Sequence, residues 1–142
     1  MINSASEVFE KGIALLNPLL VAQGFLFSDS GKGNRSGGPF ACGEFKNNDR
    51  WLELHFRGSL GMVSYHLNSR SMSHQDYMRS VIGKPNSSHY PGFSDDPLDG
   101  FRHLLLDLQE YGADFLSGTD LCLMHRIDLA NNLPPIRNGL PD

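Results

Sequence analysis

The stretch from Pro39 to Leu67, PFACGEFKNNDRWLELHFRGSLGMVSYHL, decides the fold. Within Arg50–Arg57 large apolar residues stand at every second position, and Met62–Leu67 repeats this alternation. A period of two is typical of strands that bury one face. Gly58 and Gly61, between the two strands, suit a tight hairpin.

A third strand, Phe40–Phe45, is expected to precede them across a polar Asn-Asn-Asp turn. We place Arg57 opposite Met62 and Phe45 opposite Trp51, because this register brings the apolar side chains of the three strands onto one face. A slip of one residue would move the apolar side chains of a strand from the core face to the solvent face. The residues of this apolar face are Phe40, Cys42, Leu52, Leu54, Phe56, Val63, Tyr65 and Leu67.

Four helices are expected around the sheet from their caps and apolar periodicity. They run from Ser4 or Ser6 to Gly24, from Ser73 to Gly83, from Asp96 to Gly118, and from Thr119 to about Asn131. Asn17-Pro18 either kinks the first helix or divides it, because proline suits the first position of a helix. With a short strand at Phe25–Ser28, the sequence predicts an α+β fold: an antiparallel sheet of three or four strands with helices on its apolar face.

The 142 residues are expected to form a single domain, 1–142. Within it, the glycine-rich segment Asp29–Gly38 is expected to be a flexible loop, and Leu133–Asp142, with three prolines, an extended tail. Lys32 and the glycines around it lack the spacing of a phosphate-binding loop. A mobile hairpin connection is therefore the interpretation of the loop.

Charge, apolar runs and cysteine content exclude several classes of protein. The net charge is −4, and acidic residues gather late: residues 1–90 carry 9 basic and 7 acidic side chains, residues 91–142 carry 3 and 9. The sequence has no basic stripe of the kind that would indicate nucleic-acid binding. No apolar run is long enough to cross a membrane. Two cysteines, Cys42 and Cys122, form no metal or redox motif. We expect a cytoplasmic protein without a cofactor, and its oligomeric state stays open.

One polar constellation lies on the other face of the expected sheet. The chosen register puts Glu53 opposite His66 and His55 opposite Ser64, with Cβ atoms about 5 Å apart. Glu53, His55 and His66 are thus candidates for a metal site or an acid/base task. The alternative is a solvated sheet face, which we favour because no known ligand spacing is present. Cys42 is interpreted as a core residue rather than a nucleophile.

The helix expected over Asp96–Gly118 has an acidic side that contains one apolar residue, Leu106. An apolar residue ringed by acids resembles the centre of a protein interface. The alternative is that the last helix covers Leu106. The candidate partner-binding residues are Asp99, His103, Leu106, Asp107, Glu110 and Asp114. Such a surface would suit a basic partner.

The order of elements also resembles that of small uncharacterised bacterial proteins, some of which are immunity proteins encoded beside polymorphic toxins. Four segments carry the resemblance: Phe40–Phe45, Leu52–Arg57, Ser73–Tyr77 and Tyr90–Phe93. The resemblance implies a non-enzymatic, partner-binding role and assigns no residue. Two function hypotheses follow: an immunity-type protein-binding domain, and a small metal-dependent or acid/base enzyme that uses Glu53, His55 and His66.

Overall fold

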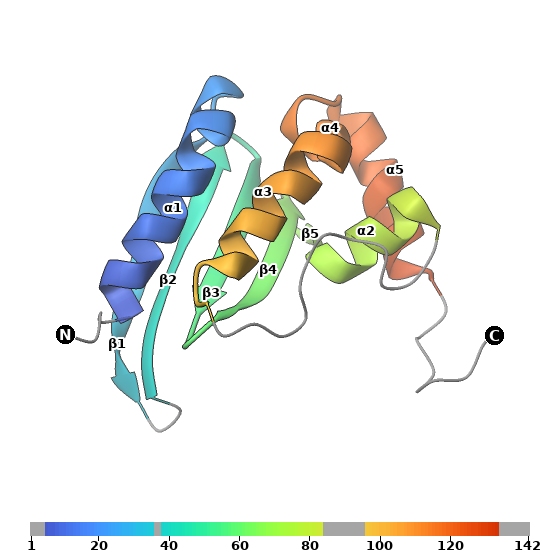
Figure 1. Cartoon of the computed structure of the whole chain (residues 1–142). Coiled ribbons are helices and arrows are strands. Elements are labelled where there is room, and N and C mark those ends of the chain that lie inside the picture. The colour runs from blue at the N-terminus through green and yellow to red at the C-terminus, as the bar shows by residue number, and fades with distance from the viewer. Residues whose placement is uncertain (1–4, 36–37, 84–95, 134–142) are drawn as a thin grey trace, which may run out of the picture.

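The computed structural model has an open antiparallel sheet of five strands with helices packed on one face (Figure 1). It describes residues 5–35, 38–83 and 96–133. The strands are neighbours in chain order: β1 (Leu26–Arg35), β2 (Gly38–Asn47), β3 (Arg50–Phe56), β4 (Leu60–Leu67) and β5 (Arg70–Ser73). The helices are α1 (Ala5–Ala22), α2 (His74–Ile82), α3 (Asp99–Tyr111), α4 (Ala113–Leu116) and α5 (Asp120–Asn131). The predicted α+β class is confirmed, and the sheet is larger than expected.

The core lies between the helices and the apolar face of the sheet. The ring of Phe9, on α1, lies 6.0 Å from Phe27 of β1, 6.4 Å from Phe56 of β3 and 6.1 Å from Phe101 of α3, between centroids. Helix α1 approaches α3 closely because residue 12 is glycine: a Cβ there would stand 2.5 Å from the Phe101 ring. Four elements therefore meet at one aromatic cluster.

Helix α1 runs through Pro18 without a break, so of the two alternatives left open by the sequence, the division into two helices is wrong. Leu16 and Leu20, on either side of the proline, are both fully buried. Their burial on one face of a continuous helix outweighs the hydrogen bond that proline removes. The helix ends as expected near Gly24, whose φ of 91° few other residues adopt.

The register between β3 and β4 differs from the expected one by two residues. Leu52 lies opposite Tyr65 and Leu54 opposite Val63, and a bulge follows His55. The bulge leaves Gly61 of β4 as the extra, unpaired residue between Leu60 and Met62, and the sequence alternation does not reveal it. Because a shift of two residues keeps every side chain on its own face, all six residues of β3 and β4 that were predicted to be buried are buried. Arg50 and Leu60, which were not predicted, are buried with them.

The register between β2 and β3 differs by one residue, which does exchange faces. Phe45 lies opposite Leu52 and not Trp51, because Asn48 takes a φ of 54° and closes a turn shorter than we expected. Phe45 and Ala41 are buried as a result. The expectation that Phe40 and Cys42 face the core is wrong, since both point to the opposite face of the sheet.

The glycine-rich segment expected to be a loop is mostly strand. Lys32 pairs with Ala41 and Gly33 with Phe40, and a bulge near Gly31 interrupts the ladder. Backbone hydrogen bonds to β2 hold this strand although its composition is poor in β-formers. Most of the expected tail, residues 134–142, lies outside the described residues.

Three N-terminal helix caps were predicted after the sheet, and two of them are confirmed. The Ser73 hydroxyl accepts a hydrogen bond from the Asp76 amide, and the Thr119 hydroxyl accepts one from the Cys122 amide. The helix expected from Asp96 to Gly118 is divided at Gly112 into α3 and α4. The carboxylate of Asp96 accepts from the Leu98 amide in a turn before α3, so Asp96 does not cap this helix.

We expect Leu54→Ala to lower the free energy of unfolding by about 2–5 kcal/mol, as is usual for truncation of a large core residue. Leu54 is fully buried, whereas His55 on the other face is about half exposed. His55→Ala should cost less than half as much. Urea unfolding of both variants measures the difference, and equally small losses would contradict the placement of Leu54 in the core.

Candidate functional site

The face of the sheet that the described helices leave uncovered is the candidate site, and we call it the open face (Figure 1). Leu26 and Met62 are the most exposed large apolar residues of this face, at 69% and 53%. The residues that define the open face are Leu26, Cys42, Glu44, Lys46, Trp51, Glu53, His55, Met62, Ser64 and His66. This face is thus a mixture of aromatic, apolar and charged groups.

The centre of the open face is a carboxylate held between two imidazoles. Glu53 Oε2 lies 2.6 Å from His55 Nε2, and Glu53 Oε1 lies 2.7 Å from His66 Nε2. The fold brings together the three residues proposed from the sequence. The expected direct pairing is wrong, because Glu53 lies opposite Ser64 and reaches His66 on the diagonal.

The electrostatics of this cluster keep Glu53 ionised. The hydrogen bond from His55 is the largest cause that lowers the pKa of the Glu53 carboxyl; partial burial opposes it, and the hydrogen bond from His66 lowers the pKa further. Both carboxylate oxygens are engaged, so each imidazole is oriented by a fixed acceptor. Such an arrangement orients the imidazoles for acid/base chemistry or for contact with a partner.

Ring stacking fixes the neighbouring residues. Trp51 and His66 stack with their ring centroids 4.6 Å apart and their planes 5° from parallel. The Lys46 ammonium lies 5.7 Å from the centroid of Trp51. Lys46, Trp51 and His66 therefore form one row across β2, β3 and β4, next to the row that contains Glu53.

Cys42 also belongs to this face, contrary to its predicted place in the core. Its thiol donates a long hydrogen bond of 3.6 Å to the carbonyl of Gly31, and its Cα is paired with that of His55. The only signal for this position was the length of the turn after β2. Among residues 5–35, 38–83 and 96–133, no group of three or more His, Cys, Asp or Glu side chains is arranged to hold a metal ion.

The acidic side of α3 is not the continuous surface that the sequence suggested. Asp107 is fully buried, so its assignment to a partner-binding surface is wrong. Its carboxylate accepts a hydrogen bond of 2.8 Å from His74 Nε2, and His74 Nδ1 shares one of 2.6 Å with the Tyr65 hydroxyl. A buried polar chain thus joins β4, α2 and α3, and α2 covers the part of α3 that we expected to face solvent.

The other residues of the predicted partner surface differ in exposure and in their contacts. Asp99 binds Arg102 at 2.7 Å, and Asp114, on α4, binds Arg126 of α5 at 2.9 Å. Leu106 is 42% exposed, so the last helix does not cover it. Glu110 is also exposed, whereas His103 is half-buried and its Nδ1 has no hydrogen-bond partner among the residues that the structure describes. The remaining exposed surface around Leu106 is smaller than the predicted one.

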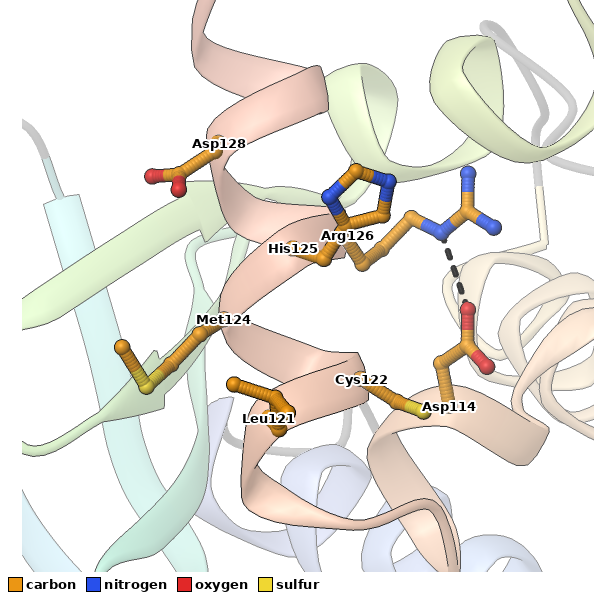
Figure 2. Close-up of a pocket in the computed structure, with 7 residues that line it drawn as sticks. All are labelled: Asp114, Leu121, Cys122, Met124, His125, Arg126 and Asp128. Carbon is orange, nitrogen blue, oxygen red and sulfur yellow. Dashed lines mark hydrogen bonds and ion pairs between the residues drawn. The ribbon is translucent and has the colours of Figure 1, made fainter.

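A shallow pocket lies along α5, and the polar side chains that line it do not point to a common centre. Figure 2 shows Met124 and Asp128 pointing to one side of the helix, and Cys122 and Arg126 to the other. The Arg126 guanidinium is occupied by Asp114 and by the carbonyl of Ser80. The polar groups around this helix therefore do not face a common point where a ligand would bind.

Comparisons with known proteins returned no match: neither a family model, nor a curated protein, nor a solved structure matches the chain significantly. In the described part of the chain, no helix has both the length and the apolar character that a membrane span requires.

We expect Asp107→Ala to lower the free energy of unfolding by about 2–5 kcal/mol, because it leaves the buried His74 without its acceptor. Glu110→Ala, on the exposed side of the same helix, should cost less than about 1 kcal/mol. Thermal and urea unfolding of both variants provide the comparison. Similar, small losses would place Asp107 at the surface after all.

Proposed function

We propose that this protein is a non-catalytic binding domain that covers another protein, with a cytoplasmic, bacterial immunity-type inhibitor of a toxin as its concrete form. The observation that carries the proposal is the composition of the open face. The solvent side of an antiparallel sheet is ordinarily polar. Here it presents Trp51, Met62 and Leu26 among charged residues, and aromatic residues and methionine are enriched in protein interfaces.

The rigidity of this face supports the same function. Trp51 is fixed by His66 on one side and Lys46 on the other, and His66 is itself held by Glu53. Side chains that are ordered before binding lose little conformational entropy when the partner arrives. A preorganised surface on a five-stranded sheet suits an inhibitor that occludes a site on its target.

The resemblance of the sequence to immunity proteins points to a toxin as the target. The chain carries a net charge of −4, so a basic target would be attracted over roughly the Debye length of about 10 Å at 0.1 M salt. Steering of this kind raises the association rate. The apolar residues of the open face would then slow dissociation.

The two candidate surfaces make different predictions for binding. We expect Met62→Ala and Trp51→Ala to raise the dissociation rate of a partner captured from the native organism, each by at least ~10-fold, the effect of about 1.4 kcal/mol. Leu106→Ala, on the α3 surface, and Leu121→Ala, on α5, serve as matched exposed controls and should change it less than about 2-fold. Surface plasmon resonance with the purified partner measures the rates.

Circular dichroism and unfolding curves must first show that each variant is folded. A partner that binds the Met62 and Trp51 variants as well as the unmodified protein would overturn the assignment to the open face. If only Leu106→Ala speeds dissociation, the α3 surface predicted from the sequence is the interface instead.

A second candidate function is favoured by one observation, the contact of Glu53 with both His55 and His66. An ionised carboxylate that orients two imidazoles is one arrangement that an acid/base enzyme can use. A metal-dependent form has less support, because the described residues offer no suitable ligand group.

Metal analysis distinguishes the enzyme hypothesis from the binding-domain hypothesis. For protein purified without a histidine tag, we expect less than a stoichiometric amount of zinc, iron or manganese by mass spectrometry. One equivalent of metal that is lost in Glu53→Gln, but retained in the control Glu10→Gln on α1, would favour the enzyme.

A further inference from the structure

A thiol and an imidazole lie opposite each other on the open face. Cys42 on β2 and His55 on β3 are paired at their Cα atoms, and directly opposite residues have Cβ atoms about 4.5–5.5 Å apart. Both side chains are half-buried on the side of the sheet that the described helices leave uncovered. A thiol and a base at this separation can exchange a proton after rotation of either side chain.

Glu53 determines which nitrogen of His55 can take that proton. Its Oε2 lies 2.6 Å from His55 Nε2, and this hydrogen bond is the largest cause that lowers the pKa of the Glu53 carboxyl. An ionised carboxylate can only accept, so Nε2 carries the hydrogen, and in the neutral ring Nδ1 then has the lone pair. Nδ1 of His55 is thus the proton acceptor that faces β2, and Glu53 stabilises the imidazolium that forms.

The neighbouring strand β1 adds no side chain over the thiol, because the residue paired with Cys42 is Gly31. A Cβ at position 31 would lie 3.7 Å from the Cys42 sulfur, so a larger residue there would pack against the thiol. The thiol donates a long hydrogen bond, 3.6 Å, to the Gly31 carbonyl. Sulfur is a weak donor, so this contact restrains the thiol little.

The charged groups around the thiol leave His55 as its base. Asp29 accepts a hydrogen bond of 3.1 Å from the Gly31 amide, and Glu44 lies two residues further along β2. Both are carboxylates, and an imidazole is a stronger base than a carboxylate. Glu53 is already bonded to the two histidines. The thiol proton therefore goes to His55.

We propose that Cys42 is a reactive thiol that exchanges with small disulfides, with His55 as its base and Glu53 as the residue that positions His55. The inference does not depend on the binding function of the open face. In the exchange, the Cys42 proton moves to His55 Nδ1 and the thiolate attacks one sulfur of the small disulfide. The S–S bond of that molecule breaks and one half becomes bonded to Cys42. The other half takes the proton back from His55 and leaves as a thiol.

A small disulfide suits this site better than an ester or an amide. Acyl transfer develops an oxyanion, which enzymes stabilise with backbone amides aimed at it. Cys42 lies in the middle of β2, whose backbone is paired with β1 on one side and with β3 on the other. The amides of this strand are thus committed to the sheet. Thiol–disulfide exchange forms no oxyanion and needs only a thiolate and access to it.

The second cysteine provides an internal control. Cys122 on α5 is the more exposed of the two, and it lines a pocket with Asp114 (Figure 2). At pH 7 we expect iodoacetamide to modify Cys42 at least ~10-fold faster than Cys122, as measured for each peptide by mass spectrometry. Exposure alone predicts the reverse order, so an equal or faster rate at Cys122 would overturn the inference.

The pH dependence separates chemistry from access. His55→Ala and Glu53→Gln should each slow alkylation of Cys42 at least ~5-fold at pH 7, but less than ~2-fold at about pH 9.5, where an ordinary thiol ionises without a base. A change in folding or access would slow it at both pH values. His125→Ala, an exposed histidine on α5, is the matched control and should leave the Cys42 rate unchanged. Equal losses at both pH values, or no loss at pH 7, would contradict the roles of His55 and Glu53.

Hydroxyethyl disulfide, a small uncharged disulfide, tests the substrate class. We expect a mixed disulfide to form at Cys42 at least ~10-fold faster than at Cys122, more slowly in His55→Ala, and to be released by dithiothreitol. Peptide mass spectrometry locates the adduct. If iodoacetamide prefers Cys42 but the disulfide does not, the proposed exchange with small disulfides is wrong.

Discussion

The burial of every second side chain of β3 is the constraint on which the other elements depend. Leu52, Leu54 and Phe56 are almost completely buried, and they fix which face of the sheet the helices must cover. Arg50, at the start of the same strand, donates hydrogen bonds to the Phe115 carbonyl and to Asp120, at 2.7 and 2.5 Å. The central strand thus determines both the core side of the sheet and the position of the chain between α4 and α5.

Features that depend on the local sequence pattern were predicted correctly, whereas features that depend on backbone geometry or on tertiary contacts were not. Period-two alternation is a local property, so it placed Glu53, His55 and His66 on one face although the pairing was wrong by two residues. The turn after β2 and the bulge after His55 are both decided by backbone geometry. The misjudged turn put Cys42 on the wrong face, whereas the bulge changed only the pairing of β3 with β4. Asp107 was misplaced because its burial depends on His74, which is distant in the chain and becomes its neighbour only through tertiary packing.

Charged residues in this fold serve different purposes at different depths. Asp107 is hydrogen-bonded to His74 within the core. Removal of its carboxylate would leave His74 Nε2 without this hydrogen-bond acceptor. Asp99 and Asp114 are matched by arginines at the helical surface. The excess acid of residues 91–142 is therefore partly compensated inside the molecule. A charge count along the sequence overstates the negative field that an approaching partner meets.

The bulge near Gly31 has a consequence for how the sheet meets other chains. β1 is an edge strand, and a long regular edge would offer its backbone groups to a strand from another molecule. The bulge breaks this edge into two shorter runs that a single straight strand cannot follow together. At the opposite edge, the Asn131 side chain donates to the carbonyl of Ser71 on the short β5. Both borders of the sheet thus discourage fibre-like stacking, while the broad face between them stays available.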